Sequence, residues 1–191
     1  EIGVRLVGSE MCIRDRYRMG LKMFDKKIYL CGFMASGKTT VGKALSKKLN
    51  IDYADTDELL VETYGQSIPE IFEKYGEEYF RDLEHNIAKK TVDIKCGVVS
   101  TGGGMLTFDR NGEILKKSGI IICLVRDFDV IYQEIKSDKR RPLAQTKTKA
   151  ELRDMYEKRI SKYQKYADYT VVNSGSIDDC VKKIMSIIDE N

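Results

Sequence analysis

The sequence is poor in proline, tryptophan and histidine: its 191 residues include two prolines, no tryptophan and one histidine. So little proline argues against a proline-rich linker or a long disordered tail. No run approaches the roughly 18 consecutive apolar residues that a membrane-spanning helix needs. Charge of one sign is also scarce, because 33 Lys and Arg against 30 Asp and Glu leave a formal net charge of +3. We therefore expect no spanning helix and no wholesale binding of nucleic acid or membrane.

The cysteines form no recognisable metal-binding pattern. They are Cys12, Cys31, Cys96, Cys123 and Cys180. They include no CxxC pair, and none stands at zinc-finger spacing from the lone His85. Scattered cysteines of odd number are typical of buried free thiols in a reducing compartment, so we expect a cytoplasmic protein. His85 lies in a charged helical stretch, and we interpret it as a surface or hydrogen-bonded histidine rather than a catalytic base.

Residues 1–22 differ from the rest of the chain. They contain no apolar stretch of signal-peptide length, and their acidic residues argue against a transit peptide. Residues 9–16 read SEMCIRDR, which is similar to the peptide that results when sequencing-adapter DNA is translated. We interpret 1–22 as a non-native extension, the alternative being a disordered arm with four arginines. One domain is then expected at 23–191, a length typical of a single domain.

From Lys26 onward, short apolar runs alternate with longer helical patterns, as in βαβ units. Strands are predicted at 27–31, 53–55, 97–100, 120–125 and 169–172. Helical stretches are predicted at 38–49, at 68–91 with a break near Gly76, and at 177–188. The pattern therefore predicts an α/β fold of three layers around a five-stranded parallel sheet.

Residues 32–39 read GFMASGKT and fit the phosphate-loop pattern G-x-x-x-x-G-K-[ST]. They stand where the mechanism requires, after a strand and at the start of a helix. Gly32 and Gly37 allow the backbone to turn its N–H groups towards phosphate, and the helix N-terminus adds partial positive charge. Lys38 is the expected point charge for the β- and γ-phosphates, and the Thr39 hydroxyl is an expected Mg²⁺ ligand.

Three more motifs stand beside strand or helix ends. Residues 55–57 read DTD just past the second strand, where two carboxylates could serve Mg²⁺ and an acceptor hydroxyl, although Asp55 or Thr56 could simply cap a helix. Arg81 and Glu84 share a helix face, which is equally consistent with a solvated intrahelical ion pair. Residues 101–104 read TGGG after the third strand, and such bare backbone lets a ligand approach closely.

In this order the motifs are similar to those of shikimate kinase. The matching segments are 32–39, 55–57, 80–84 (FRDLE), 101–104, 141–143 (RPL) and 159–163 (RISKY). Their order and spacing match from Lys26 to Asn191. The resemblance implies a P-loop kinase fold with a mobile lid at about 137–149. It also implies ATP-dependent phosphorylation of the 3-hydroxyl of shikimate, in chorismate and aromatic amino-acid biosynthesis.

The resemblance also implies roles for single residues. The expected catalytic residues are Lys38, Asp57 and Arg141. The expected ATP-binding residues are Ala35, Ser36, Gly37, Lys38, Thr39, Thr40 and Arg141. The expected substrate-binding residues are Asp57, Arg81, Gly103, Gly104 and Arg159. Thr39 and Asp55 are expected to hold one Mg²⁺ ion, Asp55 through water. ATP and shikimate are the expected partners of a monomeric enzyme.

The chemistry of these side chains agrees with the implied substrate. Arg81 and Arg159 carry planar guanidinium forks, which suit bidentate recognition of a carboxylate. Asp57 is expected to orient the 3-hydroxyl, and whether it also deprotonates it stays open. Arg141 is expected to bring a cation onto the γ-phosphate, where such charge raises the rate by orders of magnitude.

The chain departs from the family pattern at three positions. Ala35 stands where the family usually has glycine, and its Cβ could tighten the loop. Glu134 stands where an arginine often precedes the lid motif, which leaves that arginine's role on the adenine side in doubt. Ala144 replaces a second leucine after the lid Arg-Pro-Leu.

Other functions fit parts of the pattern. Another small-molecule P-loop kinase, such as a gluconate or nucleoside-monophosphate kinase, would share the phosphate loop. A nucleotide acceptor should, however, require base-stacking groups and several lid arginines, and a neutral sugar acid lacks the rigid ring carboxylate. A kinase-like module without chemistry would share the fold, but it could lose Lys38 or Asp57, and both are present. The basic run at 137–149 could also be a solvated face or an RNA-binding patch.

Overall fold

The structure is a computed structural model that describes residues 27–94, 97–137 and 147–189. Five parallel strands lie in the order β2-β3-β1-β4-β5. They are β1 (Lys27–Cys31), β2 (Tyr53–Asp55), β3 (Gly97–Ser100), β4 (Ile120–Val125) and β5 (Tyr169–Val172). All five strands predicted from the sequence are confirmed.

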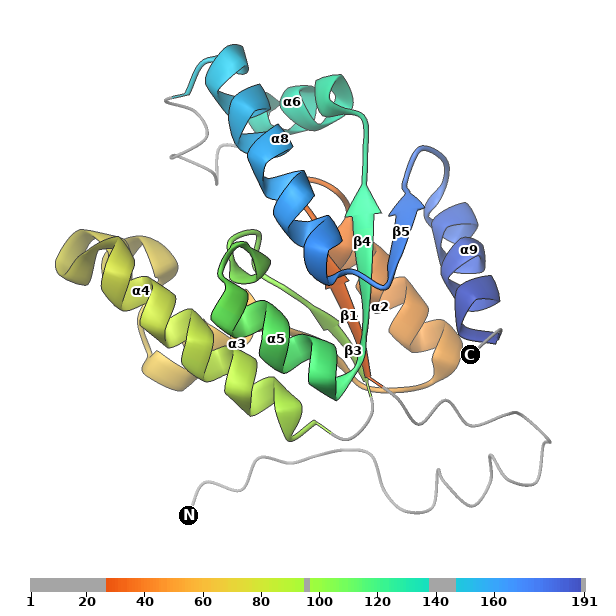
Figure 1. Ribbon diagram of the computed structural model, residues 1–191, viewed down its shortest axis with the longest axis horizontal. Coiled ribbons are helices and arrows are strands. Elements are labelled where there is room, and N and C mark those ends of the chain that lie inside the picture. The colour runs from red at the N-terminus through yellow and green to blue at the C-terminus, as the bar shows by residue number, and fades with distance from the viewer. Residues whose placement is uncertain (1–26, 95–96, 138–146, 190–191) are drawn as a thin grey trace.

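Helices connect the strands and cover both faces of the sheet (Figure 1). They are α2 (Lys38–Leu49), α3 (Thr56–Tyr64), α4 (Ile68–Val92), α5 (Asp109–Ser118), α6 (Phe128–Ser137), α8 (Lys149–Tyr166) and α9 (Ile177–Asp189), with a 3-10 turn η1 at Met105–Thr107. The three predicted helices correspond to α2, α4 and α9. The predicted break in α4 is also confirmed, because Gly76 has a non-helical backbone with φ of 79°.

Alternation of side chains along the central strands explains the three layers. Ile28 and Leu30 of β1 point to one face of the sheet, where they pack with α2 and α9. Tyr29 and Cys31 point to the other face, which α4, α5 and α8 cover. A parallel strand that is buried on both faces must be apolar throughout, and this explains the continuous apolar runs of β1 and β4.

The motifs meet because their strands are neighbours. Strands β2, β3 and β1 lie side by side, and all three point the same way. The Asp-Thr-Asp motif, the triple glycine and the phosphate loop follow these strands and therefore reach the same carboxyl edge of the sheet. The start of the glycine motif is held against β1, since the N–H of Thr101 donates to the carbonyl of Leu30 at 2.9 Å.

Several smaller predictions concern cysteine, histidine and the ends of the domain. The described cysteines Cys31, Cys123 and Cys180 are buried free thiols, as predicted. His85 is hydrogen-bonded as predicted, with its Nδ1 2.8 Å from Oδ1 of Asn111. Within the described ranges no helix is long and apolar enough to cross a membrane. The predicted extension at 1–22 and most of the predicted lid, residues 138–146, lie outside the described residues.

Candidate active site

The phosphate loop connects β1 to α2 in the middle of the sheet. Gly37 is the N-cap of α2 in the left-handed region, with φ of 95°. Gly32 has φ of 144°, and a Cβ there would lie 2.4 Å from the carbonyl oxygen of Leu124. The ammonium group of Lys38 reaches back over the loop and donates to the carbonyls of Gly32 at 3.0 Å and Phe33 at 2.9 Å. The loop therefore has the cradle shape that its sequence predicts.

A cavity of about 640 Å³ opens in front of this loop. It is lined by Met34, Ala35, Gly37, Lys38, Thr39, Thr40, Asp55, Asp57, Thr101, Gly103 and Glu134. The cavity thus unites most of the predicted nucleotide-binding set with both predicted aspartates and one predicted substrate-binding glycine. Ser36 also belongs to the loop, but it is buried beneath it, and its hydroxyl has no hydrogen-bond partner among the described residues.

Asp55 has one of the roles that the sequence left open, that of a helix cap. One carboxylate oxygen caps α3 by accepting the backbone N–H of Asp57 at 3.0 Å. The other oxygen accepts from the hydroxyl of Thr39 at 3.2 Å and from that of Tyr53 at 3.3 Å. Burial raises the pKa of Tyr53 to about 12, so this phenol stays a hydrogen-bond donor. The cap therefore holds the carboxylate of Asp55 beside Thr39, the residue that follows Lys38.

The triple glycine provides room for charged side chains. A Cβ on Gly102 would lie 2.4 Å from Oδ1 of Asp57, and one on Gly104 would lie 2.3 Å from Nη1 of Arg81. The N–H of Gly102 donates to the hydroxyl of Thr56 at 2.7 Å, which fixes the start of α3 against this loop. A side chain on either glycine would therefore collide with the carboxylate of Asp57 or the guanidinium of Arg81, whether or not a ligand is bound.

Arg81 and Glu84 form the predicted ion pair, but the pair is buried rather than solvated. The guanidinium Nη1 lies 2.6 Å from Glu84 Oε2, and the two side chains are only 13% and 2% exposed. The opposite edge of the guanidinium contacts Glu77, which is 66% exposed. Burial raises the pKa of Glu84, and the positive charge of Arg81 opposes that rise. The pair fixes Arg81 across the face of Phe108.

Arg159 and Tyr163 on α8 hold the glycine loop through the carbonyl of Gly103. The guanidinium of Arg159 donates to the carbonyl of Gly103 at 3.3 Å, and the hydroxyl of Tyr163 donates to the same oxygen. Burial raises the pKa of Tyr163 well above its ordinary value, so its proton stays in place. The guanidinium also lies over Phe33 of the phosphate loop. The structure thus brings both predicted substrate arginines to the glycine loop, Arg81 beside Gly104 and Arg159 beside Gly103.

Two side chains that support the phosphate loop were not among the predicted site residues. Asn173 donates from Nδ2 to the carbonyl of Ser36 at 2.9 Å, and Arg126 donates from Nη1 to the carbonyl of Ala35 at 3.1 Å. Each directly follows a strand, Asn173 after β5 and Arg126 after β4. Their position at strand ends is the signal by which they could have been found. The predicted Arg141 lies outside the described residues.

Comparison with known proteins identifies the family of this chain. A sequence profile described as "SKI: Shikimate kinase" matches residues 34–189. The chain belongs to the shikimate kinase family. Among shikimate kinases, the protein from Thermodesulfovibrio yellowstonii is 41% identical over 151 residues, which cover 78% of this chain and 87% of that protein. The shikimate kinase of Geobacter sulfurreducens is 35% identical over 181 residues, covering 94% and 99%.

Solved structures show the same fold. The shikimate kinase from Acinetobacter baumannii in complex with shikimate has a TM-score of 0.83 and 37% identity, covering 88% of this chain and 96% of that one. The shikimate kinase of Aquifex aeolicus has a TM-score of 0.76 and 38% identity, covering 85% and 96%. The chain is therefore a kinase of the shikimate pathway with a P-loop fold, as its motifs predict.

Proposed function

We propose that this shikimate kinase transfers the γ-phosphate of ATP to the 3-hydroxyl of shikimate in the 640 Å³ cavity. The observation that carries the proposal is that Lys38 and Asp57 line one cavity while Arg81 and Arg159 flank the glycine loop at its side. A phosphate cradle, an acidic group for a hydroxyl and two cations for a carboxylate are what this pair of substrates requires.

The phosphate loop supports binding of the nucleotide. Its backbone N–H groups and the N-terminus of α2 offer partial positive charge, and Lys38 adds a full charge at the loop's rim. Residues 35–40 form the proposed ATP-binding set, together with Arg141. We propose Arg141 as the cation that reaches the γ-phosphate from the lid at 137–149, although it lies outside the described residues.

The acceptor side is supported by paired charges. Asp57 lies against Gly102. The negative charge of Asp57 raises the pKa of the buried Glu84, and the positive charge of Arg159 lowers it, so all three charges lie close together. We propose that Arg81 and Arg159 bind the carboxylate of shikimate, and that Gly103 and Gly104 offer backbone contacts. Asp57 then faces the 3-hydroxyl, which it orients for in-line attack on the γ-phosphate.

The residues at the rim fit one Mg²⁺ ion. Thr39 Oγ1 and Asp55 Oδ2 lie 3.2 Å apart, and hydroxyl and carboxylate oxygens are the ligands that Mg²⁺ prefers. We propose that these two residues hold it, Asp55 through water. When bound, the ion neutralises charge on the β- and γ-phosphates. A cytoplasmic location and a monomeric state belong to the same proposal, and the buried free thiols support the first of them.

An acceptor panel tests the proposal. The full chain is offered ATP and Mg²⁺ with shikimate, gluconate or a nucleoside monophosphate, and release of ADP is measured against a blank without acceptor. Of the three acceptors, we expect only shikimate to give more ADP than the blank. D57N should abolish turnover and leave ATP affinity unchanged. ADP formed with another acceptor and not with shikimate would refute the assignment, and a loss of ATP affinity in D57N would refute the role of Asp57.

A further inference from the structure

Ala35 has a backbone conformation that alanine rarely adopts. Its φ of 59° lies in the left-handed region, and the only other described non-glycine residue with positive φ is Asn50, which ends α2. The Cβ of an L-residue crowds the backbone there, so such a residue persists only where its surroundings hold it. Ala35 also lines the nucleotide cavity, which places the strain inside the candidate site.

Arg126 is the side chain that holds this residue. Its Nη1 donates to the carbonyl of Ala35 at 3.1 Å across 91 positions of sequence. That carbonyl and the N–H of Ser36 belong to one planar peptide unit, and the N–H donates to the carbonyl of Phe33 at 3.2 Å, so Arg126 and this turn hold the same peptide from its two ends. Asn173 holds the next peptide in the same way, through the carbonyl of Ser36. Side chains at the ends of β4 and β5 therefore hold the carbonyls of two successive loop peptides.

Arg126 is itself held on two sides. Its guanidinium pairs with the carboxylate of Glu134 on α6, and the side chains of Arg126 and Glu134 are 28% and 50% exposed. Its carbonyl accepts from the hydroxyl of Tyr156 at 3.0 Å, and the Tyr156 ring packs edge-on against Phe33 of the phosphate loop.

We propose that Arg126 is a positioning residue for the nucleotide, which holds the phosphate loop in its binding conformation through the carbonyl of Ala35. The inference rests on the proposed function, because it takes the cavity as the ATP site. Because the guanidinium donates to the carbonyl of Ala35, Arg126 acts on ATP through the loop. Its contribution depends on the alanine: glycine adopts φ near +60° without the Cβ penalty and needs less support.

The test measures ATP affinity of the full chain by calorimetry, in the absence of acceptor, for R126A, R126K and R126A in an A35G background. We expect R126A to weaken ATP binding about tenfold or more, as for loss of a hydrogen bond from a charged donor. R126K should restore part of the loss. In the A35G background, R126A should cost no more than about twofold. The KM for shikimate should stay within about twofold throughout, which a general loss of structure would not allow.

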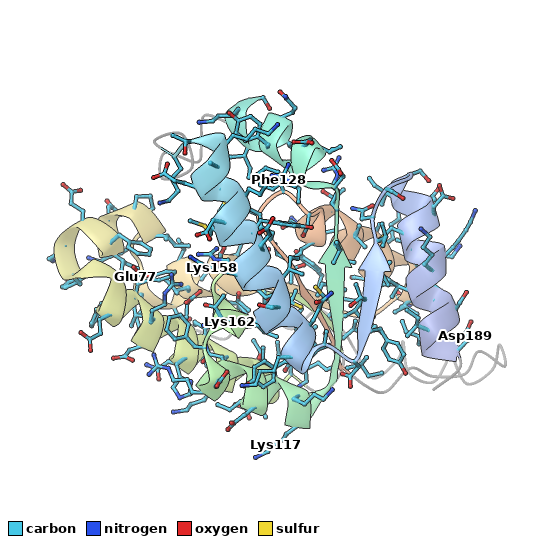
Figure 2. The ribbon with its side chains drawn as sticks, turned by 45° about the horizontal axis from the view of Figure 1, so that its top comes forward. Glu77, Lys117, Phe128, Lys158, Lys162 and Asp189 are labelled. Atoms are coloured by element: carbon cyan, nitrogen blue, oxygen red, sulfur yellow. The ribbon has the colours of Figure 1, made fainter. Side chains whose placement is uncertain are left out.

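R153A is the matched control. Arg153 on α8 also pairs with an acid, Asp129, at 3.3 Å. Its guanidinium packs over the ring of Phe128, which is labelled in Figure 2, where α6 meets α8. Loss of this arginine should leave ATP affinity within about twofold. If R126A does not fold, R126M carries the same comparison, since it keeps the length of the side chain without a donor.

Two results would overturn the inference: unchanged ATP affinity in R126A, or an equal loss with and without A35G. If the unaltered chain itself fails to bind ATP, the proposed function fails, and the inference fails with it. A chain that binds ATP and phosphorylates shikimate, but is insensitive to Arg126, refutes the inference alone.

Discussion

Substitution of Glu84 tests how Arg81, which we propose binds the substrate carboxylate, is held in place. Arg81 contacts two acids through opposite edges of its guanidinium: Glu84 at 2.6 Å, almost fully buried, and Glu77 at 2.7 Å, largely exposed. The same arginine therefore provides a buried pair and a matched exposed pair in one helix. Burial decides how much each is worth, since solvent screens an exposed pair and leaves a buried one unscreened.

The magnitudes follow from these exposures. Removing one partner of a buried ion pair typically costs about 3–5 kcal/mol, because the other charge is left unpaired. Arg81 would keep Glu77 and some contact with water, so we expect E84A to lower the free energy of unfolding by about 2–4 kcal/mol. E84Q keeps the shape and one acceptor oxygen and should cost about 1–2 kcal/mol. E77A, the control, should cost less than about 1 kcal/mol.

Urea unfolding of the three variants measures the stabilities, and initial rates at saturating ATP measure the KM for shikimate. E84Q should raise that KM about tenfold while E77A leaves it within about twofold, because only Glu84 fixes the guanidinium from within the core. Equal destabilisation by E84A and E77A would show that the pair is not buried as described. An unchanged KM in E84Q would show that the orientation of Arg81 does not matter for the substrate.

Three further predictions concern the neighbouring loop and helix. G102A should lower kcat at least about tenfold in steady-state assays, because the new methyl would lie 2.4 Å from Oδ1 of Asp57 and would push that carboxylate out of position. An unchanged kcat would contradict the position of Asp57 against Gly102. Tyr163→Phe should raise the KM for shikimate a few fold at unchanged ATP affinity, since the carbonyl of Gly103 loses a donor, and an effect on ATP alone would be inconsistent. Hydrogen bonds from Thr148 at the start of α8 lower the pKa of Glu151 below its ordinary 4.5. The ionised Glu151 therefore stabilises the folded state above pH 4.5, and this stabilisation is lost as the pH falls through the lowered pKa. Thermal unfolding against pH should therefore show the wild type and E151Q converging in acid, and a constant difference would contradict it.

The phosphate loop and the five strands could be predicted because their signals are local. A loop that cradles phosphate needs glycine, lysine and threonine at set spacings, and a buried strand needs a short run of apolar residues. The glycine loop and Asp57 could be placed at one edge for the same reason, since each directly follows a strand. Helices α3, α5, α6 and α8 were not predicted. In α3 the first turn lies inside the Asp-Thr-Asp motif, and Asp55 is both motif and cap.

What could not be predicted depends on contacts between distant segments. The positions of Arg126 and Asn173 after strands mark them as candidates, but their contacts with the phosphate loop, across 91 and 137 positions, follow only from the strand order. The spacing of Arg81 and Glu84 is the same for an exposed and a buried pair. Their burial follows from packing against Phe108 and the bare backbone of the glycine loop, which no pattern within α4 encodes.

The position of the transferred phosphate tests the central claim most directly. The full chain is incubated with ATP, Mg²⁺ and shikimate, and the product is examined by phosphorus and proton NMR alongside the amount of ADP formed. We predict one phosphate per ADP, coupled to the proton on carbon 3 of the ring. Phosphate on another hydroxyl, or ADP formed without a phosphorylated product, would contradict the arrangement of Lys38, Asp57 and the two arginines described above.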